Sequence, residues 1–311
     1  MCRFLPFSFA CLLAAAPALH AQRPDRPQAP PVPPTVAAMP DLPYAGTDNK
    51  RQQLDLYLPK AREAGKTLPV LVFIHGGAWL AGDKSQGRGQ VLRAVAEGKA
   101  AGVSIGYRLS SEAPWPAQIH DCKAAIRWIK AHAKEHNLDP DRIVVWGSSA
   151  GGHLVAVLGT SAGVPEMDGT LGPDTDQNTK VAGVIDFFGP TDVSQMDAQR
   201  LPDGQKHDSA DSPESKLLGA PVQTVPDKVR SANPITYVDP TDPPFLMVHG
   251  DKDPLVPHGQ SELLAAALTK AKVPHELYTV PGGGHGGFKD PEVPIKVRAF
   301  LEARFEKKLE R

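Results

Sequence analysis

The stretch VVWGSSAGGH places two serines in a turn of small residues after an apolar run. A serine hydroxyl becomes a nucleophile only when a base lies beside it and the backbone presents its oxygen freely. A strand that turns sharply into a helix presents the oxygen, provided that the residues two before and two after the serine are small. Gly147 and Gly151 flank Ser149 in this way. The matching neighbour of Ser148 is Trp146, whose indole is too large, so the spacing predicts Ser149 as the nucleophile.

A second glycine-rich turn, FIHGGAW at residues 73–79, follows an earlier apolar run. Acyl transfer passes through an oxyanion that needs preorganised backbone N–H donors, and glycine lets the backbone come that close. We expect Gly77 and Ala78 to supply two of these donors, although Gly76 could replace one of them. The amide of Ala150, which follows the nucleophile, is the third expected donor.

An acid and a base should follow later in the chain, in the order serine, carboxylate, histidine. The segment FLMVHGDKDPLVP carries Asp251 and Asp253 in the loop after an apolar run. We expect Asp253 to orient the histidine and Asp251 to cap the turn. VPGGGHGGF supplies His285 as the base, among glycines that leave its ring accessible. His258 opens a helical pattern and His275 enters a strand pattern, so both are expected to be solvated or packed side chains.

Alternating secondary structure must position these loops. Within residues 44–311, apolar runs of strand length alternate with helical patterns, notably at residues 116–136 and 258–272. This predicts an α/β fold in which helices cover both faces of a mainly parallel sheet. Residues 192–236 interrupt the rhythm with a polar, proline-dotted stretch, interpreted as a small cap beside the active site or, alternatively, as a mobile surface loop. The expected strands are QLDLYL, LPVLVFIHGG, AGVSIGYRL, RIVVWG, VAGVIDFFG, PFLMVHG and HELYTV.

The N-terminus predicts export. Arg3 precedes the apolar stretch FLPFSFACLLAAAPAL, and Ala21 offers a small residue before a cleavage site whose exact position stays open. Residues 1–21 are therefore expected to be a signal peptide and the protein to be secreted or periplasmic, with a retained anchor or a lipid on Cys11 as alternatives. Residues 22–43 are rich in proline and lack hydrophobic periodicity, so they predict an extended linker before the catalytic domain.

Charge and composition disfavour several partners and cofactors. The 311-residue chain carries 34 Lys and Arg against 35 Asp and Glu, so no basic excess indicates nucleic acid or an anionic membrane surface. The apolar leader is short for stable membrane insertion. No cofactor is expected, since GGGHGG at residues 282–287 matches a dinucleotide motif that also needs a following helix, strand and acidic residue about 20 positions on. His132 and His136 have the spacing of a metal pair but no third ligand, so no metal is expected. Cys122 is expected to be a small buried apolar residue.

Eight segments together resemble a known family. In chain order they are HGGAW, YRLS, PAQIHDCKAAIRWI, GSSAGGHL, DFFGPTD, NPITYV, HGDKDPLVP and GGGHGGF, spread over roughly residues 50–288. They resemble the α/β-hydrolase esterases related to hormone-sensitive lipase, and most closely the bifunctional feruloyl and acetyl xylan esterases. The resemblance implies the α/β-hydrolase fold and removal of small acyl groups from plant polysaccharide such as xylan. Ala78 departs from it, because many members have a third glycine there; its N–H can still donate, but a methyl group faces the pocket.

The expected reaction is a two-step hydrolysis by a serine carboxylic ester hydrolase. His285 takes the proton as Ser149 attacks the carbonyl, while Asp253 fixes the imidazole. A general short-chain carboxylesterase, a serine peptidase related to the prolyl peptidases, and a catalytically inactive binding module are the alternatives. The prolyl peptidases share only the catalytic core, and an intact triad argues against the inactive module. We expect a small ester or an esterified carbohydrate as substrate; the acyl group, the alcohol and the oligomeric state are not written in the sequence.

Overall fold

The computed structural model describes residues 30–63 and 65–306. The expected signal peptide, residues 1–21, and residues 22–29 of the expected linker lie outside the described residues.

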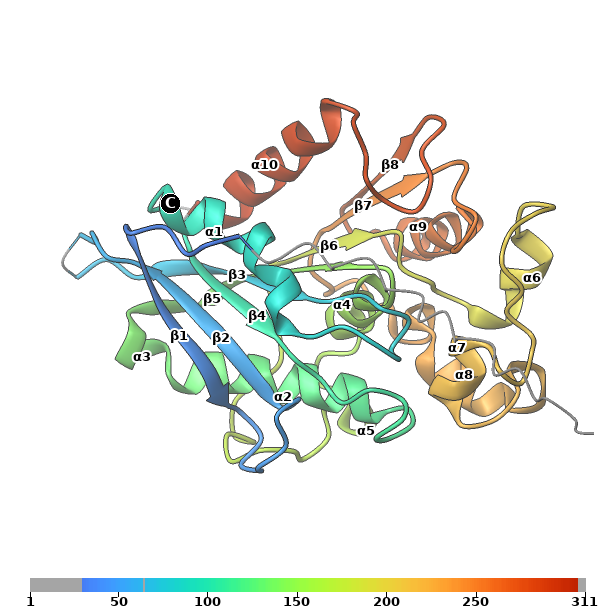
Figure 1. Cartoon of the computed structure of the whole chain (residues 1–311), viewed down its shortest axis with the longest axis horizontal. Coiled ribbons are helices and arrows are strands. Elements are labelled where there is room, and N and C mark those ends of the chain that lie inside the picture. The colour runs from blue at the N-terminus through green and yellow to red at the C-terminus, as the bar shows by residue number, and fades with distance from the viewer. Residues whose placement is uncertain (1–29, 64, 307–311) are drawn as a thin grey trace, which may run out of the picture.

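One sheet runs through the centre of the molecule (Figure 1). Its eight strands lie in the order β1-β2-β4-β3-β5-β6-β7-β8. β2 is antiparallel to both β1 and β4, and every other neighbouring pair is parallel, so the expected mainly parallel sheet is confirmed. The strands are β1 (Val36–Pro43), β2 (Gln53–Pro59), β3 (Leu68–Ile74), β4 (Ala101–Ile105), β5 (Leu138–Ser148), β6 (Gly183–Phe187), β7 (Phe245–Gly250) and β8 (His275–Val280).

Helices cover both faces of this sheet, as the sequence predicts (Figure 1). The longer helices are α1 (Arg88–Ala96), α2 (Ala117–Ala131), α4 (Ala150–Thr160), α9 (Gly259–Ala271) and α10 (Glu292–Phe305). Val70 and Val72 of β3 belong to the core that includes α2, α4 and α9, whereas Leu71 and Phe73 belong to the core that includes α1 and α10. Alternate side chains of a central strand are thus buried on opposite faces, which explains its continuous apolar sequence. None of the described helices combines the length and apolarity needed to cross a membrane.

The helical pattern expected at residues 116–136 forms α2 and the short α3 (Ala133–His136), with a break at His132. The rings of His132 and His136 both stack on Trp128, with centroids 4.2 and 6.0 Å from that of the indole. Cys122 is a free thiol, fully buried on α2 as predicted, and burial raises its pKa well above the usual value.

The expected linker at residues 22–43 is wrong in its last part, because Val36–Pro43 forms the edge strand β1. β1 pairs antiparallel with β2, and Val36 is only 4% exposed. Its remaining residues are exposed or half-buried, so no hydrophobic period marks the strand in the sequence. An edge strand also tolerates Pro40 and Pro43, since only one side of it needs backbone donors. The folded domain therefore begins before Tyr44.

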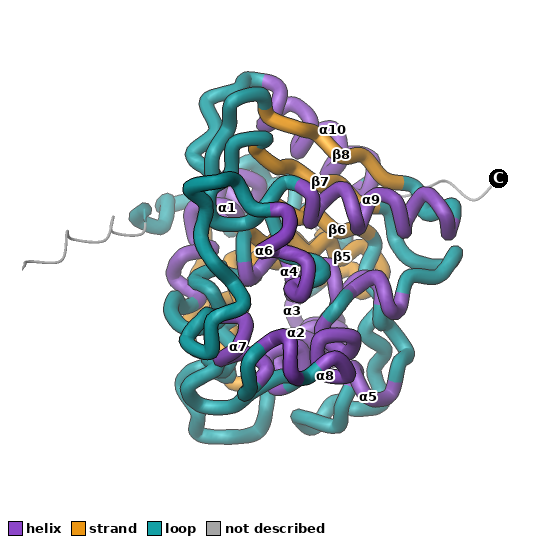
Figure 2. Tube along the Cα trace, turned by 90° about the vertical axis from the view of Figure 1, so that its right-hand side faces the viewer, coloured by secondary structure: helices purple, strands orange, loops and turns teal. Residues whose placement is uncertain are grey.

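Residues 192–236 fold into short helices. Figure 1 shows α6, α7 and α8 gathered at one end of the molecule, and Figure 2 views the molecule from that end. The Gln205 N–H donates to the carbonyl oxygen of Pro254 at 2.8 Å, which places the segment against the residue that follows Asp253. The helices are η2 (Val193–Gln195), α6 (Met196–Gln199), α7 (Pro213–Leu218), η3 (Val222–Thr224), α8 (Pro226–Ala232) and η4 (Pro234–Tyr237); the other short helices are η1 (Lys84–Gly87) and α5 (Pro165–Asp168).

The buried position of Val36 gives a test of the corrected boundary. Val36→Ala should lower the free energy of unfolding in urea by about 1.5 kcal/mol, since each lost buried methyl group contributes about 0.8 kcal/mol. Ala38→Ser, at an exposed position of the same strand, is the matched control and should leave stability unchanged. Equal unfolding midpoints for Val36→Ala and the parent protein would mean that this segment is a tether.

Candidate active site

Ser149 lies at the turn between β5 and α4, with φ 57° and ψ −125°. A non-glycine residue in such a conformation costs on the order of 1–3 kcal/mol and persists only where its surroundings hold it. Here the Ser149 N–H donates to the carbonyl of Phe187 at 2.8 Å, and the Ser149 carbonyl accepts from the N–H of His153 at 3.0 Å. Hydrogen bonds on both sides therefore fix the strained turn that presents the hydroxyl.

Two glycines allow β5 and α4 to meet around Ser149. A Cβ on Gly147 would lie 2.1 Å from the carbonyl oxygen of Gly151, and a Cβ on Gly151 would lie 2.1 Å from that of Ile74. Neither position can hold a side chain without moving backbone. Trp146, one residue earlier, belongs to the core on the α1 and α10 face of the sheet. The steric requirement that selected Ser149 in the sequence is thus met by backbone contacts on two sides.

The structure brings His285 and Asp253 to Ser149 from the loops after β8 and β7. His285 Nε2 lies 3.0 Å from Ser149 Oγ, and His285 Nδ1 lies 2.7 Å from Asp253 Oδ2. Because the carboxylate can only accept, Nδ1 carries the proton and Nε2 is free to accept from the serine hydroxyl. This arrangement can move the serine proton to His285 and hold the resulting imidazolium beside a carboxylate.

The Asp253 carboxylate is charged although its side chain is 0% exposed. Burial by itself would raise its pKa, but hydrogen bonds from His249 and His285, with the N–H of Val256, hold the pKa well below its usual range. Oδ1 accepts from the amides of Leu255 and Val256 at 2.8 and 2.9 Å. The acid therefore stays ionised at every pH where the imidazole is a useful base.

The other sequence candidates occupy different places. Asp251 Oδ1 accepts from the N–H of Gly282 at 2.7 Å and so joins the loops after β7 and β8. His258 immediately precedes α9, with Nε2 2.9 Å from Thr279 Oγ1. His275 is the first residue of β8. His258 and His275 are half-buried side chains, in keeping with the expectation that they are packed or solvated. Asp251 was expected to cap its own turn and instead bridges two loops.

The turn after β3 brings backbone amides to the nucleophile. Gly76 lies against Ser149, because a Cβ built on it would be 3.3 Å from the serine Cβ. Among residues 30–63 and 65–306, the amides of Gly77, Ala78 and Ala150 donate to no protein acceptor. The first amides of a helix such as α4 have no partner inside the helix. All three expected donors are therefore free to bind an oxyanion.

His75 orients the peptide bond between Gly76 and Gly77. Its Nδ1 lies 2.8 Å from the Gly76 carbonyl oxygen, so Nδ1 carries a proton and donates there. In a trans peptide the N–H points opposite to the C=O, which directs the Gly77 amide away from His75. The ring is fully buried and stacks on Tyr107 at 4.2 Å. Burial lowers the pKa of His75 to about 4, so the ring is neutral at neutral pH.

Two non-glycine residues share the strained backbone of this turn. Ala78 and Trp79 both have φ 55°. Trp79 is 1% exposed, and its ring packs edge-on against that of His153 with centroids 5.2 Å apart. The backbone carbonyl of Trp79 accepts from the Ser110 N–H at 2.8 Å. These contacts hold the conformation that lets alanine stand where the resembled esterases often have glycine.

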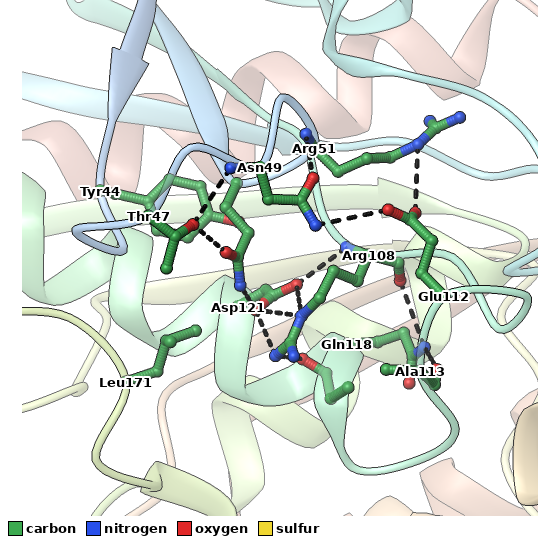
Figure 3. A network of polar contacts seen from close by, with 12 residues as sticks. Tyr44, Thr47, Asn49, Arg51, Arg108, Glu112, Ala113, Gln118, Asp121 and Leu171 are labelled. Carbon is green, nitrogen blue, oxygen red and sulfur yellow. Dashed lines mark hydrogen bonds and ion pairs between the residues drawn. The ribbon is translucent and has the colours of Figure 1, made fainter.

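A polar network fixes the loop after β4 (Figure 3). The same loop supports Trp79 through the hydrogen bond from the Ser110 N–H. The Arg108 guanidinium contacts both oxygens of the buried Asp121 carboxylate, at 2.7 Å to Oδ1 and 2.9 Å to Oδ2. Gln52 Nε2 donates to Oδ1 at 2.8 Å. Glu112 pairs with Arg51 at 3.3 Å. The network joins the turn before β2, the loop after β4 and helix α2.

Sequence reasoning assigned no role to several side chains that touch this machinery. His75 directly precedes the two glycines of the oxyanion turn, so the motif itself held that signal. Phe188 packs on His285 with ring centroids 4.5 Å apart. His153 lies one helical turn after Ser149 on α4, and its N–H donates to the Ser149 carbonyl. His249 contacts the carboxylate of Asp253. The last three follow from strand order and packing, which no local pattern displays.

Comparisons with known proteins agree with this geometry. The BD-FAE family model matches residues 54–268. Esterase LipQ of Mycobacterium tuberculosis is 31% identical over 267 residues, covering 85% of this chain and 60% of the relative. The chain thus spans about 60% of the length of the curated relatives it matches.

Two solved structures share the fold at higher identity. A truncated form of a carbohydrate esterase from gut microbiota has a TM-score of 0.78 and 34% identity, covering 87% of this chain and 97% of that one. A bifunctional GH43-CE protein of Bacteroides eggerthii has a TM-score of 0.78 and 35% identity, covering 86% of this chain and 35% of that one.

Buried ionisable groups near the nucleophile link stability to pH. His153 is fully buried, its Nε2 lies 2.7 Å from the Ala232 carbonyl oxygen, and burial lowers its pKa to about 4. The unfolded chain, with an ordinary histidine pKa, takes up a proton first on acidification. His75 acts in the same direction. Burial raises the pKa of Asp186 to about 6, which opposes them, because the folded carboxyl is protonated first. Burial also raises the pKa of Asp242 to about 7, so the two carboxyls oppose the two histidines. The contribution of His153 alone should therefore fall as the pH drops from about 6.5 towards 4, and a variant at that position isolates it.

His153→Gln tests this linkage, because glutamine can keep an N–H donor for Ala232 but does not titrate. The parent protein should lose more unfolding free energy between pH 6.5 and 5 than the variant does, by about 1.5 kcal/mol. Urea unfolding at several pH values measures the difference, with the two proteins compared at pH 7.5 as the reference. Identical pH slopes would show that His153 takes up its proton equally in the folded and unfolded states, so that burial does not lower its pKa.

Proposed function

The chain has the α/β-hydrolase fold and belongs to the BD-FAE family of esterases, and from this premise we propose that it is a serine carboxylic ester hydrolase with Ser149, His285 and Asp253 as its triad. One observation carries the proposal. The three side chains form a continuous relay, at 3.0 Å and 2.7 Å, beside backbone amides that have no acceptor in the part of the chain that the structure describes. An inactive binding module has no need of a strained serine aligned with a correctly protonated imidazole.

The geometry gives each group a step in hydrolysis. Ser149 Oγ attacks the ester carbonyl while its proton moves to His285 Nε2, and Asp253 stabilises the imidazolium. The amides of Gly77, Ala78 and Ala150 hold the oxyanion as the tetrahedral intermediate forms. His285 then gives the proton to the leaving alcohol, and the acyl group stays on Ser149. A water molecule attacks this acyl enzyme by the same route, which releases the acid and restores the serine.

The adjacent serines provide a matched test of the nucleophile. Ser149→Ala should lower kcat on an aryl acetate by at least about 10⁴-fold, because no other group forms the acyl enzyme. Ser148→Ala should retain activity within about tenfold, since among the described residues its hydroxyl has no hydrogen-bond partner. A fluorophosphonate probe should label the Ser148→Ala protein and leave the Ser149→Ala protein unlabelled. Parent-level turnover by Ser149→Ala would overturn the assignment.

We further propose an esterified carbohydrate as the substrate class. The support is that the two structural neighbours above are described as a carbohydrate esterase and as a bifunctional GH43-CE protein. The resemblance to feruloyl and acetyl xylan esterases, and the apolar leader that predicts export, point to the same substrate class and to action outside the cytoplasm. A general short-chain carboxylesterase is the second candidate, favoured by the similarity to esterase LipQ.

A substrate panel separates these candidates. Acetylated xylan, methyl ferulate, aryl esters of rising acyl length and chromogenic prolyl peptides should be compared at equal enzyme concentration, with Ser149→Ala as the blank. We expect kcat/KM to be highest for acetylated xylan or methyl ferulate and to fall with acyl length, because pocket shape sets specificity. Activity confined to aryl esters would favour the general carboxylesterase. A preference for long acyl chains or for peptides would contradict the carbohydrate proposal.

A further inference from the structure

A second histidine contacts the triad carboxylate. His249 is the second-last residue of β7, and its side chain is 0% exposed. Its Nε2 lies 3.3 Å from Asp253 Oδ2, the same oxygen that accepts from His285 Nδ1 at 2.7 Å. We propose that His249 is a positioning residue that holds this oxygen in line with His285. The inference rests on the proposed ester hydrolysis and adds a fourth side chain to its relay.

The proton on His249 can be placed from its neighbours. Nε2 also lies 2.9 Å from the Val256 carbonyl oxygen, which can only accept. Nε2 therefore carries a proton and donates it to the Val256 carbonyl, and Asp253 Oδ2 lies close enough, at 3.3 Å, to attract the same N–H. Nδ1 lies 2.7 Å from Ser261 Oγ and accepts from that hydroxyl in the neutral ring. His249 thus offers the carboxylate a donor whose position is fixed at both ring nitrogens.

The four donors around the carboxylate divide evenly between its two oxygens. The amides of Leu255 and Val256 hold Oδ1 at 2.8 and 2.9 Å. His249 and His285 hold Oδ2. Without His249, Oδ2 would be held only by His285, whose own charge changes in every turnover. The fixed N–H of His249 keeps the oxygen in place while the base gains and loses its proton.

The His249 ring is itself fixed from several elements. Phe188 after β6 meets it edge-on at 6.3 Å, and the same phenyl ring packs on His285 at 4.5 Å. The ring of His258, before α9, has its centroid 5.4 Å from that of His249. The titratable groups that face His249 are therefore Asp253 on its own loop, His258 beside α9 and the buried Asp186 at the end of β6. These ring contacts and the hydrogen bonds at both ring nitrogens fix the position of Nε2.

Loss of this donor should change turnover more than binding, because His249 touches the acid and not the nucleophile. Without the His249 donor, Asp253 Oδ2 should also pair more strongly with the His285 imidazolium. A more strongly paired imidazolium is harder to deprotonate, so the acid limb of the pH profile should move to higher pH, by up to about one unit. A side chain that only fills space would leave that limb in place.

Two amide variants separate the donor from the volume. Gln at position 249 can place an N–H near the position of the ring Nε2, whereas Asn reaches only the position of Nδ1. With an aryl acetate as substrate and active sites counted by fluorophosphonate labelling, His249→Asn should lower kcat by about 10- to 100-fold with KM within about twofold. His249→Gln should restore kcat to within about threefold of the parent and return the acid limb to its parent position. Ser261→Ala, which removes only the partner of Nδ1, is the control and should stay within about threefold.

Failure of the proposed function would look different. In that case the parent protein itself would neither hydrolyse the ester nor react with the fluorophosphonate probe. With an active parent, equal kcat and equal pH profiles for His249→Asn and the parent would overturn the positioning role. Equal losses of kcat in the Asn and Gln variants would assign His249 to packing alone, provided that thermal unfolding shows both variants to be folded. If His249→Asn does not fold, His249→Gln decides: an acid limb at the parent position supports the role, and a displaced limb overturns it.

Discussion

The structure depends on the close approach of three backbone segments at the turn around Ser149. β3, β5 and the start of α4 meet there with no side chain between them, since a Cβ on Gly147 or Gly151 would lie 2.1 Å from a carbonyl oxygen. β3 and β5 are parallel neighbours in the middle of the sheet, so their carboxyl ends share one edge. The same contact therefore sets the nucleophile and brings the amides of the turn after β3 beside it.

Strain in these two turns is held in place by the surrounding packing. Ser149, Ala78 and Trp79 all have positive φ, and each carries a hydrogen bond or a buried ring contact or adjoins a residue that does. Such a backbone lowers stability, but its donors need no reorganisation when charge develops on a substrate. The acid shows a similar balance: burial removes the water that would solvate the Asp253 carboxylate, and protein N–H groups take the place of that water and keep the group ionised.

The sequence is most informative where elements are buried on both faces and least informative at the edge. Central strands such as β3 and β7 read as continuous apolar runs, because every side chain meets a helix layer. The sequence of β1 predicts a linker because the strand buries only Val36 and is held by pairing with β2, which follows it after a loop. α10 buries only Val293 and Val297, so its pattern did not stand out either. Pairing energy of this kind comes from a partner and leaves no period in the strand's own residues.

The sequence by itself determined which serine can be the nucleophile, because the steric requirement acts within five consecutive residues around Ser149. It also narrowed the acid and base to Asp253 and His285 through their order after successive strands. Only the tertiary structure decided which atoms meet, since Ser149 and His285 are 136 residues apart and strand order alone brings their loops together. The same is true of His249: its donor reaches Asp253 because of how the turn after β7 folds back on the strand, a distance that spacing in the chain does not specify.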